Sequence, residues 1–594
     1  MATAELRRRW AWPALALVLV GALALRLWGV QQGLPYAYNA DEADHFVPHA
    51  VAMFGHSLNP HYFANPPAFT YVLHYVFAIT YGGTSGVHHA FGYDPTEVYT
   101  LARVAAAVLG VLALWLLYAT GARLFNRAVG LVAAAIEAVA FLPVFYAHLA
   151  LNDVPTLAPL TLSLLGSAGV VTKGRKRDYL LAGVGLGLAC ATKYTAGIVV
   201  VPFVAVAIAR ALDCGNGDVE GSNASKGSRG SKLAVRAALG ALLTLLAAAV
   251  AFFVANPYAL LDYKSFHAEL VHQSTLSAEA QGKLGAPREG GFAYYLWSLT
   301  WGFGWAPALA ALGGAVAIWW RRASLGWLLV PAPLLFLLFM GLQGRYFGRW
   351  LMPILPLLCL LAAFFVLALA GWLVQLARRS RSRRSPLALA CAALLVALTL
   401  AQGVVFSVHS GVTLARVDTR KITRTWLLAH VPQRTKIVVE PVSPDGWARE
   451  LPGALPPQRN AYVWSKYPSL LSRISPTGAL LLHGFHVVGI ENYVRTLSPA
   501  LIGFYEQHGY CVVVSASQQS GRAFADPRAA PLAVAYYRRL QREGEVVFRA
   551  SPYGRGEGPV AFGFDWSFDY YPLAFDRPGP SVTVYRLHGG RCPR

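Results

Sequence analysis

The chain has 594 residues, of which 56% are hydrophobic and only 13% are charged. A soluble globular protein carries about 25% charged residues, so the composition excludes that class and predicts a polytopic membrane protein. The formal net charge of +22 would suit a nucleic-acid-binding protein, but the basic residues gather in short connections between apolar segments. We therefore expect no nucleic-acid partner.

Apolar segments that could cross a membrane follow one another from Trp12 to about Ser407. A hydrocarbon core about 30 Å thick needs roughly 20 apolar residues per helix. The first segment follows Arg7-Arg8-Arg9, and its apolar run is too long for a cleaved signal peptide, so we predict an uncleaved first helix. In chain order, about eleven crossings are predicted, at residues 11–30, 101–119, 128–147, 154–171, 179–192, 195–211, 233–254, 292–319, 325–341, 348–377 and 387–408.

Two of these segments have unusual features. The segments on either side of Lys193 are short, so a single hairpin that does not fully cross is the alternative there. Gly183, Gly185 and Gly187 imitate a dinucleotide-binding fingerprint, but no strand precedes them and no acidic residue follows. Close packing of helices is therefore the preferred interpretation of these glycines.

The basic connections orient the chain. The runs from Lys173 to Arg177, from Lys226 to Arg236 and from Arg378 to Arg384 are predicted to be cytoplasmic by the positive-inside rule. An odd number of crossings then puts the N-terminus in the cytoplasm and the C-terminal region outside a cell (plasma or inner) membrane. The apolar stretch from Ala68 to Tyr81 cannot be a further crossing, because most later basic loops would then lie outside. We predict a juxtamembrane helix at the outer interface instead.

The first exterior loop concentrates ionisable side chains: Asp41, Glu42, Asp44, His45 and His49. Asn39 followed three residues later by Glu42 is typical of a capping box, so the two acids Asp41 and Glu42 either begin a helix or act chemically. On a helix, Glu42, His45 and His49 would share one face, which suits a divalent metal ion. The alternative is that the histidines are merely interfacial, and Pro48 would kink the helix. No other cofactor is predicted.

Later exterior loops add candidate groups of both charges. Asp153 precedes Val154-Pro155, where it either caps the next helix or takes part in a site. Lys193 either extends its amine to the interface or reaches a lipid phosphate. Arg345 and Arg349 lie at an exterior helix end, against the general charge bias, and their spacing would put both on one helical face as an anion clamp. Carboxylates and cations together suit a site that abstracts a proton and holds a phosphate.

A second unit is predicted after the membrane domain of residues 1–410. Residues 411–594 alternate helices, at 418–430, 493–508 and 531–542, with short apolar strands at 436–439, 510–515, 546–548 and 582–587. This pattern indicates a small exterior α/β domain. Such a domain could bind an acceptor or cover the active site, or it could only stabilise the protein. Cys511 and Cys592 could form a disulfide, and residues 213–232 have the composition of a flexible linker.

Five motifs in order resemble the membrane glycosyltransferases of the GT-C class. The resemblance is to the branch of protein O-mannosyltransferases and the lipid A aminoarabinose transferase (glycosyltransferase families 39 and 83), and it covers about residues 12–370. The motifs are Asp41-Glu42, Asn65-Pro66-Pro67, Leu149-Ala150-Leu151-Asn152-Asp153-Val154-Pro155, Ala191-Thr192-Lys193-Tyr194-Thr195, and Arg345-Tyr346 with Leu351-Met352-Pro353.

The resemblance implies a sugar donor carried on a polyprenyl phosphate and used on the exterior face of the membrane. Asp41 would be the catalytic carboxylate of the first loop, Asp153 the second-loop carboxylate that shapes the site, and Lys193 and Arg345 the groups that hold the lipid phosphate. The sequence departs from the family at Asn65, where a charged residue is often found, and in its additional histidines.

The implied reaction is an inverting transfer of the sugar to an acceptor hydroxyl of a protein, lipid or glycan. Asp41 would act as general base, a role worth about 10²–10⁴ in rate, and Arg349 would join Arg345 and Lys193 in stabilising the leaving phosphate. The rivals are a multi-pass transporter and a lipid-binding scaffold without catalysis. A transporter is disfavoured because we find no internal repeat and the ionisable clusters lie in exterior loops.

Overall fold

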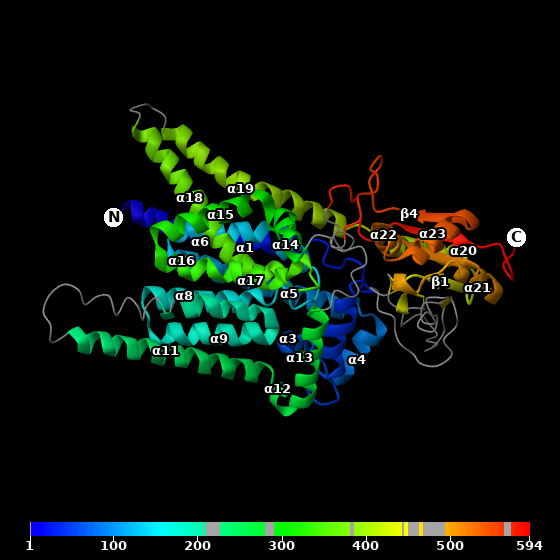
Figure 1. Ribbon diagram of the computed structural model, residues 1–594, viewed down its shortest axis with the longest axis horizontal. Coiled ribbons are helices and arrows are strands. Elements are labelled where there is room, and N and C mark those ends of the chain that lie inside the picture. The colour runs from blue at the N-terminus through cyan, green and yellow to red at the C-terminus, as the bar shows by residue number, and fades with distance from the viewer. Residues whose placement is uncertain are drawn as a thin grey trace.

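The computed structural model describes residues 2–205, 207–208, 226–278, 290–379, 385–441, 443, 445–448, 463–466, 493–563 and 572–593. A long helical bundle forms one end of the molecule and a small α/β unit the other, with the two termini at opposite ends (Figure 1). Residues 213–225 of the predicted linker and 380–384 of the basic run lie outside the described residues. Residues 226–232, also predicted as linker, are helical instead, because they continue the long apolar helix that follows them.

Ten of the eleven predicted crossings coincide with a helix or with consecutive helical segments, and residues 206 and 209–211 of the crossing predicted at 195–211 lie outside the described residues. The bundle consists of α1 (Ala2–Leu27), α5 (Thr96–Leu124), α6 (Arg127–Val139), α7 (Phe141–Tyr146), α8 (Leu157–Thr172), α9 (Lys176–Thr192), η2 (Tyr194–Val199), α11 (Lys226–Ala255), α14 (Gly291–Leu299), η3 (Thr300–Gly304), α15 (Trp305–Arg321), α16 (Ala323–Leu329), α17 (Pro331–Gly341), η4 (Gly348–Ile354), α18 (Leu355–Arg379) and α19 (Ser385–Leu414). Among the described residues, seven helical segments are long and apolar enough to cross a membrane. The prediction of a mainly helical, polytopic membrane protein is confirmed.

Glycines allow α9 to lie between α8 and α11. A Cβ atom on Gly185 would lie 2.3 Å from the backbone nitrogen of Ser163 in α8. On the other side, a Cβ atom on Gly187 would lie 2.2 Å from the carbonyl oxygen of Ala248 in α11. Any larger residue would push the helices apart, so the glycines serve close packing, as the sequence predicted.

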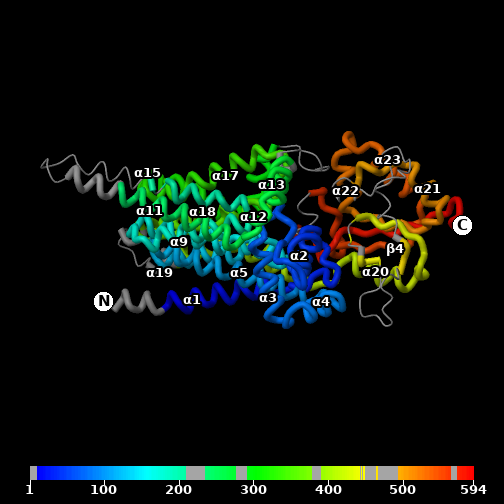
Figure 2. Tube along the Cα trace, turned by 90° about the horizontal axis from the view of Figure 1, so that it is seen from below, coloured from blue at the N-terminus to red at the C-terminus, as the bar shows by residue number. Residues whose placement is uncertain are grey.

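Short helices cover the end of the bundle that faces the α/β unit. They are η1 (Glu42–Phe46), α2 (Val47–Ala52), α3 (Ala68–Tyr81), α4 (Thr84–Tyr93), α12 (Tyr258–Leu261) and α13 (Tyr263–Ala278). In Figure 2, α2, α3 and α4 gather at this end, between the long helices and the α/β unit. Helix α3 has 14 residues and packs against α2, α4, α5 and α9, a position that agrees with the predicted juxtamembrane helix.

The α/β unit is built on a five-stranded sheet of order β2-β1-β3-β5-β4. Strands β2 (Ser465–Lys466), β1 (Lys436–Val439) and β3 (Val512–Ala516) run parallel, whereas β5 (Val582–Arg586) is antiparallel to both β3 and β4 (Glu545–Ala550). Its helices are α20 (Thr419–His430), α21 (Ala500–His508), α22 (Ser517–Ala525) and α23 (Pro531–Glu543), with short turns η5 (Asp445–Ala448) and η7 (Tyr493–Thr496). The sequence predicted these elements except β2, η5 and α22.

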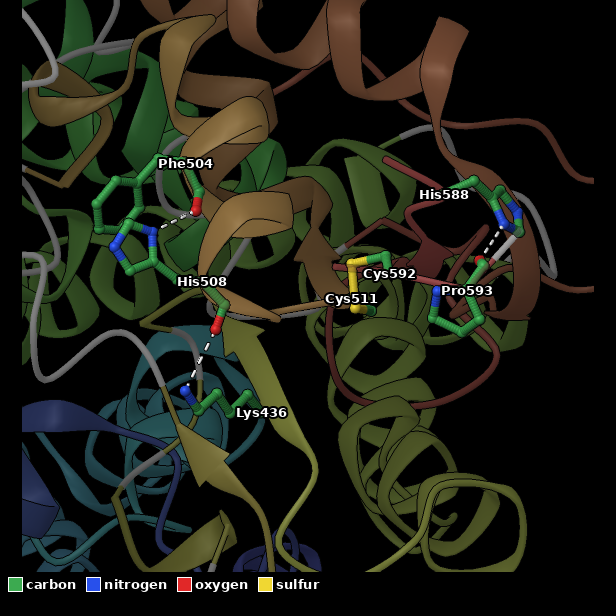
Figure 3. Close-up of a disulfide and its surroundings, with 7 residues drawn as sticks. All are labelled: Lys436, Phe504, His508, Cys511, His588, Cys592 and Pro593. Carbon is green, nitrogen blue, oxygen red and sulfur yellow. Dashed lines mark hydrogen bonds between the residues drawn. A yellow bond between two sulfur atoms is a disulfide. The ribbon is translucent and has the colours of Figure 1, made fainter. Parts of the chain in front are cut away.

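The expected disulfide is present in the α/β unit. Cys511, just before β3, is bonded to Cys592 near the end of the chain (Figure 3). Nearby, the Lys436 amine donates to the carbonyl of His508 over 3.2 Å, which ties β1 to the end of α21 (Figure 3). The tail of the chain is thereby fixed against the sheet.

Candidate active site

The loop after α1, predicted to be the first exterior loop, enters its helix through a π-helical turn. The side chain of Asn39 accepts a hydrogen bond from the Glu42 amide over 3.2 Å, and its carbonyl accepts one from the Ala43 amide over 2.9 Å. Residues Glu42–Phe46 then form the wider π-helix before α2 begins at Val47. Asp41 and Glu42 therefore stand at the start of a helix, as the capping pattern predicted, with their side chains in different surroundings.

Asp41 is the more exposed of the two acids and is paired with Arg349. Its Oδ2 accepts a hydrogen bond from Nη2 of Arg349, and its Oδ1 lies 3.8 Å from Nε2 of His45. The side chain remains 38% exposed. Burial alone would raise the pKa of Asp41, but the Arg349 guanidinium, with smaller contributions from His45 and Lys193, holds the pKa below its ordinary value. Asp41 is thus an ionised, reachable carboxylate.

Asp153 and Lys193 extend this pair into a chain of alternating charges. The Lys193 amine donates to Oδ1 of Asp153, while Nη1 of Arg349 lies 3.9 Å from Oδ2 of the same carboxylate. The adjacent Asn152 side chain donates to the carbonyl of Thr192 over 2.7 Å and fixes the two loops together. The structure therefore brings together Asp41, Arg349, Asp153 and Lys193, four predicted site residues from four separate segments.

Glu42 points away from this chain into the bundle. Its side chain is fully buried and forms two hydrogen bonds with Arg103 of α5, at 2.7 and 2.8 Å. One of its oxygens also accepts the Ala150 amide over 2.8 Å, so Glu42 ties the first loop to the segment that carries Asp153. Nη1 of Arg103 in turn donates to the carbonyls of Val30 and Gln32. These contacts favour a positioning role for Glu42.

Arg103 is a residue that sequence reasoning missed. It lies inside a predicted crossing, and an isolated charge within an apolar helix is costly unless it is paired. The cost of burying the charge of Arg103 was the sequence signal that could have indicated a functional or structural role for it. Its partner, 61 positions away along the chain, could not be identified from spacing.

The histidines of the first loop stack on one tyrosine. The rings of His45 and His49 lie 4.8 and 5.0 Å from the ring of Tyr62, nearly parallel to it. Because Glu42 faces Arg103, the expected grouping of Glu42 with the two histidines on one face is not formed. Across the described part of the chain, no cluster of three metal-binding side chains is found.

The segment after Tyr62 is held by α13. The Glu269 carboxylate accepts the amides of Phe63 and Ala64 over 2.6 and 2.8 Å. The Tyr194 hydroxyl, next to Lys193, donates to the Phe63 carbonyl over 2.9 Å. Glu269 is a second residue that the sequence did not reveal, because nothing in the local pattern of α13 links it to the first loop.

Arg345 and Arg349 flank Phe347 without sharing a helix. Helix α17 ends at Gly341 and η4 begins at Gly348, so the predicted common helical face is wrong for this segment. The Cζ atoms of Arg345 and Arg349 lie 5.9 and 5.3 Å from the Phe347 ring centroid. Glycines at both ends of the connection explain why the helix does not continue. Both guanidinium groups therefore contact the same aromatic ring.

Comparisons with known proteins agree with this architecture. Residues 97–213 match the family model for dolichyl-phosphate-mannose-protein mannosyltransferase. The fold is similar to that of the oligosaccharyltransferase of Archaeoglobus fulgidus, with a TM-score of 0.51 and 14% identity over 97% of this chain and 76% of that one. No curated protein sequence is similar enough to this chain to count as a relative.

Two further solved structures are more distant in fold. ArnT from Cupriavidus metallidurans, solved with undecaprenyl phosphate, has 14% identity over 98% of this chain and 99% of that one, with a TM-score of 0.45. The Pmt1-Pmt2 protein O-mannosyltransferase of S. cerevisiae has 20% identity over 43% of this chain and 34% of that one, with a TM-score of 0.33.

The fold is that of a polytopic, mainly helical membrane protein, with a chain of alternating charges at the end of the bundle that faces the α/β unit. The family match over residues 97–213 confirms the resemblance to the protein mannosyltransferase branch that the five ordered motifs indicated.

Proposed function

We propose that this protein transfers a glycosyl group from a polyprenyl-phosphate-linked sugar to an acceptor hydroxyl of a protein, lipid or glycan. The observation that carries the proposal is the chain formed by Asp41, Arg349, Asp153 and Lys193. It puts a reachable carboxylate beside two cations at the end of the bundle. These are the groups needed to accept a proton and to hold a lipid phosphate.

In the proposed reaction, Asp41 takes the proton of the acceptor hydroxyl as its oxygen attacks the anomeric carbon of the sugar. The bond from that carbon to the phosphate oxygen breaks, and the electron pair leaves with the polyprenyl phosphate. Direct attack from the opposite face inverts the anomeric centre. A general base of this kind contributes about 10²–10⁴ in rate.

The cations act on the leaving group. Arg349 lies between the carboxylates of Asp41 and Asp153, so a donor phosphate would compete with Asp41 for its guanidinium. Binding of the donor would then weaken the Asp41–Arg349 pair and make Asp41 a stronger base. Lys193 and Arg345 would add positive charge where the phosphate becomes more negative.

We place this end of the bundle, and the α/β unit with it, outside the cell membrane, with the N-terminus inside. Support comes from the exposed basic residues of the α8–α9 connection, at the opposite end of the bundle. In intact cells, a membrane-impermeant thiol reagent should label the exposed positions in Asp44→Cys and Gly446→Cys but spare the one in Arg175→Cys. Labelling of Arg175→Cys, without labelling of the other two variants, would contradict this orientation.

The transferase proposal is tested by incubating purified protein with a panel of polyprenyl-phosphate sugars, followed by mass spectrometry. We expect at least one donor to yield free polyprenyl phosphate together with a glycosylated acceptor or released sugar. Asp44→Asn, which alters an exposed acid of the same loop, is the matched control and should behave as the unaltered protein. Absence of turnover with every donor would overturn the proposal.

A further inference from the structure

The segment that leads into the active-site loop is packed against the α/β unit. Tyr36 and Tyr38 follow α1 and precede Asp41 by only a few residues. Tyr36 is 8% exposed and belongs to a hydrophobic cluster with Ile437 and Val439 of β1. Tyr38 packs against the same cluster. A stretch of the first exterior loop is therefore part of the core of a unit that begins almost 400 residues later.

Two arginines of α20 cover these tyrosines. The Cζ atom of Arg420 lies 3.6 Å from the ring centroid of Tyr38, a close cation–π contact. The Cζ atom of Arg424 lies 5.5 Å from the ring of Tyr36, and its Nε donates to the carbonyl of Trp447 over 2.8 Å. Removal of water from such contacts strengthens them.

The guanidinium over Tyr38 is itself held in place. Nε and Nη2 of Arg420 donate to the two carboxylate oxygens of Asp418 over 2.9 and 2.6 Å, and both side chains are almost fully buried. Asp418 also caps α20. The next residue, Thr419, donates its amide to Pro578 and its hydroxyl to Pro580. The position of Arg420 is thus set by the α/β unit.

Asn39 connects the Arg420–Tyr38 contact to the candidate active site. Tyr38 is followed directly by Asn39, whose side chain and carbonyl start the helix that carries Asp41 and Glu42. A displacement of Tyr38 would therefore change the direction of the Asp41 side chain toward Arg349.

We propose that Arg420 and Tyr38 are positioning residues, through which the α/β unit holds Asp41 in its productive orientation. This inference rests on the proposed transferase activity and assigns the α/β unit a role in catalysis. If the unit served only stability, loss of the Arg420–Tyr38 contact would lower the unfolding temperature and leave the turnover number unchanged.

The test compares Tyr38→Leu, which removes the ring, with Tyr38→Phe, which keeps it. In the purified full-length protein, Tyr38→Leu should lower kcat by about 10- to 100-fold with KM for the donor nearly unchanged, because small misplacements of a catalytic group are costly. Tyr38→Phe should stay within about twofold of the unaltered protein. Arg538→Gln, an exposed arginine of the same unit, is the matched control.

A second measurement does not depend on activity. Hydrogen exchange of the backbone amides of residues 39–46 should be faster in Tyr38→Leu than in Tyr38→Phe or Arg538→Gln. Unchanged kcat in Tyr38→Leu, or exchange equal in all variants, would overturn the inference. If the unaltered protein transfers no sugar, the proposed function fails, while the exchange rates still decide whether the contact positions the loop.

Discussion

The helical bundle and the α/β unit both hold buried carboxyl groups, but they surround them differently. At the end of the bundle, Glu42 is paired with Arg103, and Asp153 with Lys193. In the α/β unit, Glu440 is fully buried and accepts hydrogen bonds from the Ala516 amide at 2.6 Å and from the hydroxyls of Tyr537 and Ser515 at 2.7 and 3.2 Å. These donors are all uncharged.

Because of these different surroundings, the two regions respond differently to pH. Burial raises the pKa of Glu440 to about 7, because hydrogen bonds from neutral donors offset only part of its desolvation. At the end of the bundle that faces the α/β unit, Arg349 holds the pKa of Asp41 below its ordinary value. Asp41 therefore stays ionised near neutral pH, whereas Glu440 in the core of the α/β unit changes its charge there.

The largest effect is expected from Asp41→Asn, which removes the proposed base at the exposed end of the charge chain. Turnover should fall by about 10²–10⁴, while the unfolding temperature should change little because the side chain is 38% exposed. Transfer assays and thermal unfolding of the purified variant measure both quantities. Full activity in this variant would assign the chemistry to another residue.

Glu42→Gln should act mainly on stability. Loss of its charge leaves Arg103 buried without a counter-ion, which costs about 3–5 kcal/mol in comparable buried pairs. Denaturant unfolding of the purified variant measures the loss. The double variant Glu42→Gln with Arg103→Met should recover much of it, because no uncompensated charge remains. If Glu42→Gln alone is as stable as the unaltered protein, Glu42 does not have the structural role that distinguishes it from Asp41.

Arg349→Gln should lower turnover by about 10²–10³ and also change its pH dependence. Asp41 must be ionised to act, so activity is lost as pH falls through its pKa. Without Arg349, burial is the larger influence on Asp41, so the pKa of Asp41 rises. The acidic limb of the activity profile then moves to higher pH. Arg349→Lys, which keeps the charge, is the control and should leave the limb near its original position. If the acidic limb does not move in Arg349→Gln, Arg349 does not set the pKa of Asp41.

The smallest effect is expected at Glu440. Its pKa in the folded protein, about 7, lies above the ordinary value of 4.5, so the folded state binds the proton more tightly than the unfolded state. Its stabilising contribution is complete below pH 4.5 and is lost as the pH rises through 7, a change of about 3 kcal/mol. Glu440→Gln should remove this loss in unfolding experiments at pH 5 and pH 8. Glu543→Gln, which alters an exposed acid, is the control and should show the same pH dependence of stability as the unaltered protein. If Glu440→Gln also keeps that pH dependence, Glu440 is not the group responsible.

Most helices of the bundle could be predicted from the sequence because apolar runs encode them locally. Most elements of the α/β unit were also predictable, from short apolar strands between amphipathic helices. Helix α22 was missed because its sequence, Ser517-Gln518-Gln519-Ser520-Gly521, is polar and contains a glycine, so only packing against neighbouring elements favours a helix there.

The site was predictable in its members and much less in their arrangement. Asp41, Asp153, Lys193 and Arg349 were chosen because ionisable residues beside a membrane are costly unless used. Their pairing depends on contacts between segments up to 308 positions apart, which no local pattern reveals. The opposite directions of Asp41 and Glu42 likewise depend on Arg103 and Arg349 from distant helices.

The bond between Cys511 and Cys592 connects the α/β unit to the redox conditions of its compartment. It links residues 81 positions apart, and closing a loop of that length in the unfolded chain stabilises the folded state by about 4–5 kcal/mol on chain entropy alone. Such bonds persist in oxidising compartments and are rare in the cytosol. In the proposed orientation, the unit would reach its full stability only once it lies outside the reducing cytoplasm, and the segment that holds Asp41 would be secured at the same step.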